Sequence, residues 1–143
     1  MKGKTKSDLI QKVKDLYAAF GRGDAAAILA ELTGDVSWEF EAPAEMSWGG
    51  IRRGPTEAAG FFVGIANEHA DPKLEMTEFV ASGDTVAAFG RYQATVRATG
   101  RRVDTPVAHF FRFRDGKVAR YINFVNTAAF VEAGKANVTS AGQ

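Results

Sequence analysis

The residues with the greatest capacity for chemistry lie in one stretch of the sequence, VDTPVAHFFRFRDGKVARYINFVN, which spans residues 103–126. His109 stands in the middle of an apolar run, where burying a ring nitrogen costs free energy unless that nitrogen has a partner. The ordinary pKa of histidine, about 6.5, suits proton transfer at neutral pH. Tyr121 and Asn123 could orient the ring or hold a substrate carbonyl by hydrogen bonds. We therefore predict His109, Tyr121 and Asn123 as catalytic residues, with His109 as the acid–base group.

The turn at residues 114–116 separates two runs rich in Val, Ile, Phe and Tyr, a pattern that predicts a β-hairpin. A two-residue loop would pair His109 with Ile122. A three-residue loop with Gly116 in the left-handed conformation, followed by a bulge, would pair His109 with Tyr121. We favour the second arrangement, because a glycine at the third loop position is what that bulge requires. It places six residues on one face: Val107, His109, Phe111, Tyr121, Asn123 and Val125.

This face has two interpretations. An apolar surface with two or three polar groups is typical of a small-molecule pocket, but it is also typical of a packed sheet with one satisfied core histidine. A metal site is not expected, because two histidines about 40 residues apart without any cysteine match no recognised ligand spacing. No glycine-rich loop has the phosphate-binding pattern either, so we expect no cofactor.

Composition limits the possible classes of protein. The chain has 143 residues, enough for one domain with a real core, and its net charge of +1 provides no strong field for nucleic acid or anionic membrane. The absence of cysteine excludes disulfides and thiol nucleophiles. No run approaches the roughly 20 apolar residues that a membrane span needs, and the N-terminal residues lack the apolar core of a signal peptide. We therefore expect a cytoplasmic protein without nucleic-acid or membrane partners.

Three helices are predicted in the first half of the chain. The first is capped by Ser7, carries an apolar stripe at helical spacing and stops at Gly21. The second is capped by Asp24 and ends near Thr33-Gly34. The third starts at Gly54-Pro55, since proline suits the first turn of a helix. Together they would cover one side of a sheet.

A strict alternation in VSWEFE, residues 36–41, predicts a strand. Four further strands joined by short glycine-containing turns predict an antiparallel meander. His69 precedes this meander at the frayed end of the third helix, where a histidine interacts with the negative end of the helix dipole. The predicted later elements are strands at about 73–81, 85–98, 102–113 and 117–126, and a short helix at 127–133.

The segment of residues 42–53 contains one proline and two glycines and is predicted to be a loop. Its apolar residues Met46 and Trp48 leave two alternatives open. The loop is either a lid over a pocket or is anchored onto the core or a subunit interface. Glu41 and Glu45 would supply a second acid–base group if the loop folds inward, and would otherwise be solvated.

Three segments carry a resemblance to a known family: LYAAFGRGDAAAILAELTGDVSWEF at 16–40, GPTEAAGFF at 54–62 and HFFRFRDGKVARYINFVNTAAF at 109–130. The chain resembles the SnoaL-like branch of the nuclear-transport-factor-2-like superfamily, which includes ketosteroid isomerases and polyketide cyclases, over about residues 7–133. The resemblance implies an α+β, cone-shaped, cystatin-like fold. Three N-terminal helices would pack on a strongly curved antiparallel sheet and enclose a pocket. One domain would span residues 1–143, with tails at 1–6 and 134–143.

The resemblance also implies roles for individual positions. His109 falls where related cyclases carry a histidine and where isomerases carry a protonated aspartate donor. Asn123 falls where those cyclases carry the aspartate that moves protons, and Ala42 falls at the isomerase base. The isomerase tyrosine would fall near Leu16, one residue from Tyr17. Including the loop residue Trp48, the predicted substrate-binding residues are Trp38, Phe40, Trp48, Phe62, Tyr92, Val107, Phe111 and Val125.

Two functions follow as expectations. One is a cofactor-free isomerase, cyclase or hydratase acting on a small, largely apolar carbonyl compound. The other is a non-catalytic binding protein for an apolar or aromatic metabolite. The missing carboxylates at Ala42 and Asn123 favour binding, whereas a histidine beside tyrosine and asparagine favours catalysis. A homodimer is implied by the resemblance, through the outer sheet face where Phe110, Ile122 and Phe124 would lie and where exposure would be a liability.

Overall fold

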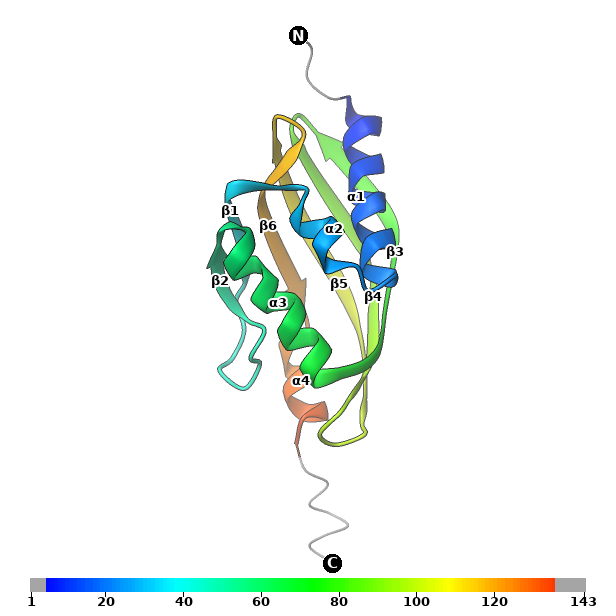
Figure 1. Ribbon diagram of the computed structural model, residues 1–143. Helices are drawn as coiled ribbons and strands as arrows, with labels where there is room; N and C mark the ends of the chain where they lie inside the picture. Colours follow the sequence, from blue (N-terminus) through cyan, green and yellow to red (C-terminus); the bar gives the residue numbers. More distant parts are fainter. Residues whose placement is uncertain (1–4, 136–143) are drawn as a thin grey trace, which may run out of the picture.

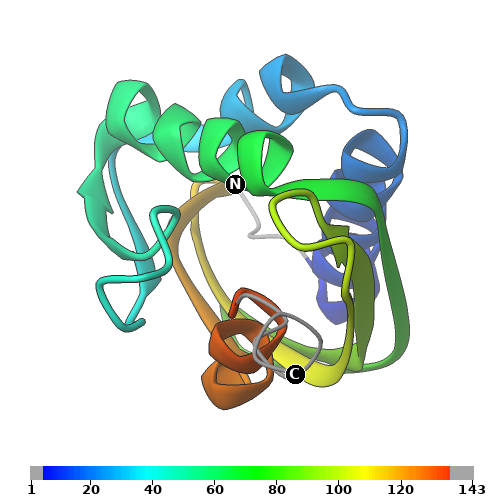
Figure 2. The same cartoon turned by 90° about the horizontal axis from the view of Figure 1, so that it is seen from below.

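The computed structural model describes residues 5–135 and has the predicted α+β architecture, built on one strongly curved six-stranded sheet (Figure 1). The strand order is β2-β1-β6-β5-β4-β3, and β1 runs parallel to β6 while the other neighbours are antiparallel. Helices α1, α2 and α3 close the concave side of the sheet, and α4 lies at one end (Figure 2). In chain order the elements are α1 (Lys6–Gly21), α2 (Ala25–Leu29), β1 (Leu32–Phe40), β2 (Gly50–Arg53), α3 (Gly54–Glu68), β3 (His69–Ser82), β4 (Thr85–Val96), β5 (Arg102–Arg114), β6 (Lys117–Val125) and α4 (Thr127–Ala133).

The first helix starts earlier than predicted, and the expected cap at Ser7 is wrong. The Asp8 backbone N–H donates to Thr5 Oγ1 at 3.1 Å, and the Thr5 N–H donates to the Asp8 carboxylate at 3.2 Å. This reciprocal capping box satisfies two donors at once, which a cap at Ser7 would not do. Lys6, placed in the tail by the sequence, therefore belongs to the helix. None of the helices within residues 5–135 is long and apolar enough to cross a membrane.

Other boundaries also differ from the prediction, among them the start of β1, which lies at Leu32 rather than at Val36. α2 ends at Leu29, before the expected Thr33-Gly34, because Leu32 already pairs with Val118 of β6. The segment 42–53 contains a short edge strand, β2, whose four residues are too few to show an alternating pattern. β3 begins at His69 rather than near residue 73. The predicted tail after Gly134 lies mostly outside the described residues.

The β5–β6 hairpin differs from both proposed registers. Arg114 pairs with Lys117, and Asp115 and Gly116 have φ angles of 53° and 79°, as a two-residue turn with positive φ at both positions requires. A register shift next to Arg112 then adds one residue on β6, so His109 faces Asn123 instead of Tyr121. The favoured and observed pairings differ by two residues. Because side chains alternate with a period of two, the six residues predicted to share one face still do.

The bend of the sheet depends on Gly90. This residue pairs with Met76 of β3 and Val107 of β5, beside an irregularity in β3 between Met76 and Glu78. A Cβ atom at position 90 would lie 1.9 Å from the Glu75 carbonyl oxygen and 2.6 Å from the Met76 Cα. Only glycine allows two backbones to approach this closely. The bulged strand can therefore bend over β4, which helps to form the concave face.

Candidate functional site

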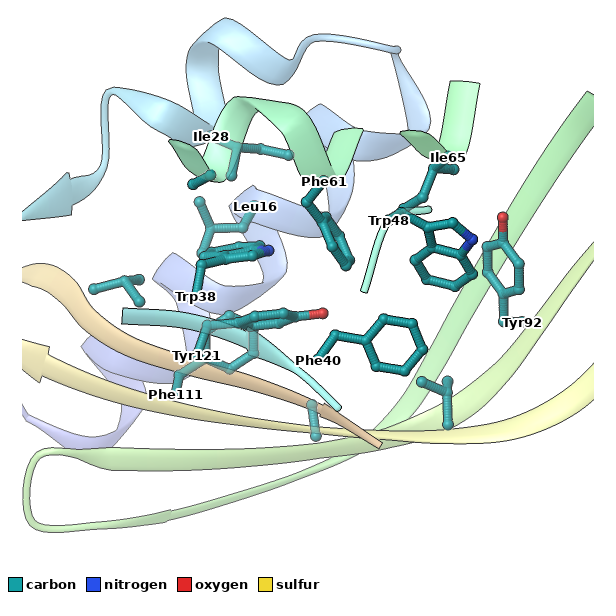
Figure 3. Close-up of a cluster of buried hydrophobic side chains, with 14 of the residues drawn as sticks. Leu16, Ile28, Trp38, Phe40, Trp48, Phe61, Ile65, Tyr92, Phe111 and Tyr121 are labelled. Atoms are coloured by element: carbon teal, nitrogen blue, oxygen red, sulfur yellow. The ribbon is translucent and has the colours of Figure 1, made fainter. Parts of the chain in front are cut away.

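A cavity of about 60 Å³ lies between the concave face of the sheet and helices α1–α3. Aromatic and aliphatic side chains from both layers surround it (Figure 3). The predicted site residues that line it are Trp38, Trp48, Phe62, Tyr92, Val107, His109, Phe111, Tyr121, Asn123 and Val125. Phe40 does not line this cavity; its ring packs on Trp48 with centroids 4.7 Å apart. Residues far apart in the sequence thus meet around one small hollow.

His109 is buried at the wall of this cavity and is held by a residue of α1. Its Nδ1 atom lies 2.8 Å from the Tyr17 hydroxyl, and the Tyr121 ring lies 5.0 Å from its own ring, centroid to centroid. The sequence did not predict Tyr17 as a site residue, because the resemblance places the isomerase tyrosine near Leu16, one residue earlier. The available signal was that Tyr17 lies in the apolar stripe of the first helix, where a buried hydroxyl needs a partner.

The buried polar groups of the site are neutral at ordinary pH. Burial lowers the pKa of His109 to about 3, and the neighbouring Asn123 side chain opposes only part of that shift. Burial raises the pKa of Tyr17 far above its usual value, and burial together with Tyr17 does the same for the pKa of Tyr121. An uncharged imidazole can accept a hydrogen bond at one nitrogen and donate at the other. Desolvation thus keeps His109 in the form that can take up a proton.

Three polar atoms at the cavity wall lack a protein partner. Within residues 5–135, the indole Nε1 atoms of Trp38 and Trp48 and the Oδ1 atom of Asn123 are buried without a hydrogen bond. An unsatisfied buried polar group costs about 1–3 kcal/mol. The Trp38 ring stacks on Tyr121 with centroids 3.8 Å apart. In Figure 3 its indole nitrogen and the Tyr121 hydroxyl point in the same direction. A molecule in the cavity would find unused donors and an unused acceptor.

A second histidine–tyrosine pair lies at the end of the site near α4. His69 is 3% exposed, and its Nδ1 lies 2.7 Å from the Tyr92 hydroxyl. The Phe130 ring of α4 stacks on the His69 ring with centroids 5.7 Å apart. Burial lowers the pKa of His69 as well. The prediction of a frayed, dipole-bound histidine is therefore wrong, because β3 starts at this residue and draws it into the core.

The loop between β1 and β2 is packed onto the core. Met46 and Trp48 are buried, and a Cβ on Gly64 of α3 would lie 2.7 Å from the Trp48 Cβ. Ser47 Oγ donates a hydrogen bond to the Glu68 carboxylate at the end of α3. Trp48 consequently forms a wall of the cavity while the loop itself is anchored.

The carboxylates of this loop take no part in the cavity. Glu41 and Glu45 are exposed, and neither lines the cavity. Within residues 5–135, no three His, Cys, Asp or Glu side chains gather where they could hold a metal ion. The polar groups at the cavity are therefore the imidazole, the phenols, the indoles and one amide.

The sequence and the fold correspond to a known class of protein. The sequence matches the family described as the SnoaL-like domain over residues 13–121, well over half of its length. The chain belongs to the SnoaL-like domain family, as its sequence segments had predicted.

Solved structures with this fold are similar along nearly the whole chain. A nuclear-transport-factor-2-like protein of unknown function from Burkholderia pseudomallei is 29% identical with a TM-score of 0.82, over 90% of this chain and 98% of that one. A nuclear-transport-factor-2-like protein from Burkholderia thailandensis is 30% identical with a TM-score of 0.82, over 89% of this chain and 97% of that one. TerC, co-crystallised with polyporic acid, is 27% identical with a TM-score of 0.80, over 88% and 97%. Among curated proteins, none matches the sequence.

Proposed function

We propose that the protein binds a small, largely apolar carbonyl compound in the cavity and moves a proton on it without a cofactor, as an isomerase, cyclase or hydratase would. The observation that carries this proposal is the buried, neutral His109 imidazole, held at Nδ1 by Tyr17 in a hollow with unpartnered polar atoms. The neighbour TerC was co-crystallised with polyporic acid, which supports a small-molecule ligand for this protein as well.

In the proposed reaction, His109 Nε2 removes a proton from the carbon next to the carbonyl, while Nδ1–H donates to the Tyr17 oxygen. The electrons of the broken C–H bond move into the carbonyl group and form an enolate. The Asn123 amide and the Trp38 indole donate hydrogen bonds to the enolate oxygen. When the ligand carries a C=C bond next to the carbon that loses the proton, the enolate extends over it as a dienolate, and the imidazolium returns the proton to the far carbon of that bond. The double bond has then moved into conjugation with the carbonyl, which completes an isomerisation.

The low pKa of His109 applies when no anion occupies the cavity. A base with a pKa of about 3 is weak, but the enolate places a negative charge beside the imidazolium. An opposite charge within about 4–6 Å favours the protonated form and raises the pKa of the histidine. The pKa of His109 rises as the proton moves and the enolate charge forms. The attraction between imidazolium and enolate therefore stabilises the transition state more than the bound ketone.

A second candidate is a non-catalytic binding protein for an apolar metabolite. It is favoured by a specific observation: among residues 5–135, no aspartate or glutamate lines the cavity. Asn123 cannot exchange protons, and Ala42 provides no base. In this case His109 and Asn123 would only hydrogen-bond the ligand.

Proton exchange on bound ketones separates the two candidates. We expect the wild-type protein to accelerate deuterium incorporation at the sp³ carbon next to the carbonyl of cyclic enones in D₂O, measured by NMR. His109→Gln should reduce this rate about 10²–10⁴-fold, the usual contribution of a positioned acid–base group. The affinity, measured by quenching of tryptophan fluorescence, should change much less.

His69→Gln is the matched control, because it removes the other buried histidine, which does not line the cavity. It should retain the exchange rate within a few-fold. Binding by the wild type without any exchange would support the second candidate. Exchange that survives in His109→Gln would contradict the proposed role of His109.

We also propose that a second copy of the chain covers the convex face of the sheet. A contiguous patch of exposed apolar side chains marks an interaction surface. A two-fold contact buries the same patch on both copies of the chain. Val80, Phe89 and Phe124 are 59%, 42% and 55% exposed. The apolar residues form two cross-strand rows, Val80–Ala87–Phe110–Ile122 and Phe89–Ala108–Phe124.

The double variant Phe89→Glu/Phe124→Glu is expected to be monomeric under conditions in which the wild type is dimeric, as measured by size-exclusion chromatography with light scattering. Burying unpaired carboxylates would cost several kcal/mol. Val63→Glu is the control, since Val63 is 58% exposed on α3 rather than on the sheet. A wild type that stays monomeric at high concentration would contradict the dimer.

A further inference from the structure

A second apolar hollow lies on the outer side of the helices. It measures about 350 Å³ and is formed by the start of α2 and the outer face of α3, including Ala25, Ala59, Val63 and Ala66. We call this surface the helical groove. Val63 is 58% exposed in it. The charged residue of the groove, Asp24, accepts a hydrogen bond from the Ala27 N–H and pairs with Arg22. The groove therefore offers apolar contacts.

The helical groove and the inner cavity share one wall. Phe20, Ile28, Phe62 and Ile65 line both hollows. Ile28 and Ile65 are buried, whereas Phe20 and Phe62 are partly exposed. On the inner side, the Phe62 ring lies 5.6 Å from the Trp38 ring, centroid to centroid. A single layer of side chains thus separates the two spaces, and its two phenylalanines are the members that reach solvent.

The size of the inner cavity makes this wall important. About 60 Å³ holds only about four water-sized groups, whereas pockets for small organic molecules usually measure about 300–1,000 Å³. A ligand with its carbonyl at His109 and more than a few further atoms must therefore extend past the wall. The helical groove, at about 350 Å³, lies directly behind Phe20 and Phe62.

We infer that Phe20 and Phe62 form a gate between the cavity and the helical groove, and that the groove binds the apolar chain of a ligand whose carbonyl group reaches His109. This inference rests on the proposed function, because the carbonyl must occupy the inner cavity. Its ligand class is a ketone that carries an alkyl or aryl chain long enough to cross the gate. Val63 and the small alanines of α3 contact this chain.

A series of 2-alkanones of increasing chain length tests the gate. Trp38 and Trp48 are the two tryptophans of the chain and both line the cavity, so their fluorescence reports binding. We expect affinity to rise about three- to fourfold for each added methylene once the chain enters the groove. Val63→Asp should abolish this gain for long alkanones and leave short ones unchanged. Phe62→Ala should accelerate association of long alkanones at least tenfold in stopped-flow measurements.

Asn67→Asp is the control, because it adds the same charge to an exposed position of α3 outside the groove. It should behave as the wild type. Binding of short alkanones without a chain-length gain, or equal weakening of short and long alkanones by Val63→Asp, would overturn the gate alone. Failure of every alkanone to bind the wild type would overturn both the gate and the proposed function.

Discussion

Gly90→Ala is expected to lower the free energy of unfolding by more than about 3 kcal/mol, among the largest effects of a single substitution. The added Cβ would lie 1.9 Å from the Glu75 carbonyl oxygen, and the obstructing atoms belong to the backbone of β3. Unlike a flexible side chain, a hydrogen-bonded strand cannot rotate aside. β3 would have to separate from β4 at its irregular register. Urea unfolding followed by circular dichroism measures the loss as a lower midpoint.

Gly21→Ala is the matched control. Gly21 is the last residue of α1, and apart from its chain neighbours and the backbone of its own helix, no atom of residues 5–135 lies within 4 Å of a Cβ built on it. Its stability should change by less than about 1 kcal/mol, because alanine is accommodated in a helical conformation and restricts the unfolded chain. A Gly90→Ala protein as stable as Gly21→Ala would show that the strands can approach without glycine.

Acidification from pH 7 to pH 5 is expected to cost the protein about 2 kcal/mol through His109 alone. The folded-state pKa of His109 is about 3, below its ordinary value of 6.5. The unfolded chain therefore binds more protons than the folded one between these values. The stabilising contribution is complete above about pH 6.5 and is lost progressively as the pH falls toward 3. His69 adds to the loss, because burial lowers its pKa in the same direction.

Urea titrations at pH 5, 6 and 7 measure this effect. His109→Gln should reduce the difference in unfolding free energy between pH 7 and pH 5 by about 2 kcal/mol, and a loss of stability that is equal at both pH values does not enter this difference. His69→Gln is the comparison, since it removes only its own contribution and leaves that of His109. An unchanged pH dependence in His109→Gln would mean that His109 titrates normally in the folded protein.

Much of the architecture could be predicted from local patterns. The alternation of VSWEFE, the glycine turns of the meander and Pro55 at a helix start were sufficient to predict the α+β class and most boundaries. The predicted ends of helices and strands were wrong where an interaction that the local pattern does not show was more favourable. Thr5, two residues before Ser7, is the N-cap and forms a capping box with Asp8. Leu32 joins β1 because a strand from the other end of the chain, β6, lies beside it.

The candidate site could be predicted only in part. Alternation along a strand is a local property, so the sequence by itself determined that Val107, His109 and Phe111 share a face, as do Tyr121 and Asn123 on the next strand. That the two sets lie on the same side was decided by the register, because the two-residue turn alone would pair His109 with Ile122 and the extra residue of β6 beside Arg112 restores the pairing with Asn123. The partner of a buried polar atom depends on which elements pack together. Only the tertiary structure therefore decided that His109 meets Tyr17, 92 positions away. It also decided that His69 Nδ1 meets the Tyr92 hydroxyl, because a buried ring nitrogen needs a hydrogen-bond partner and the packing of the elements determines which group lies within reach.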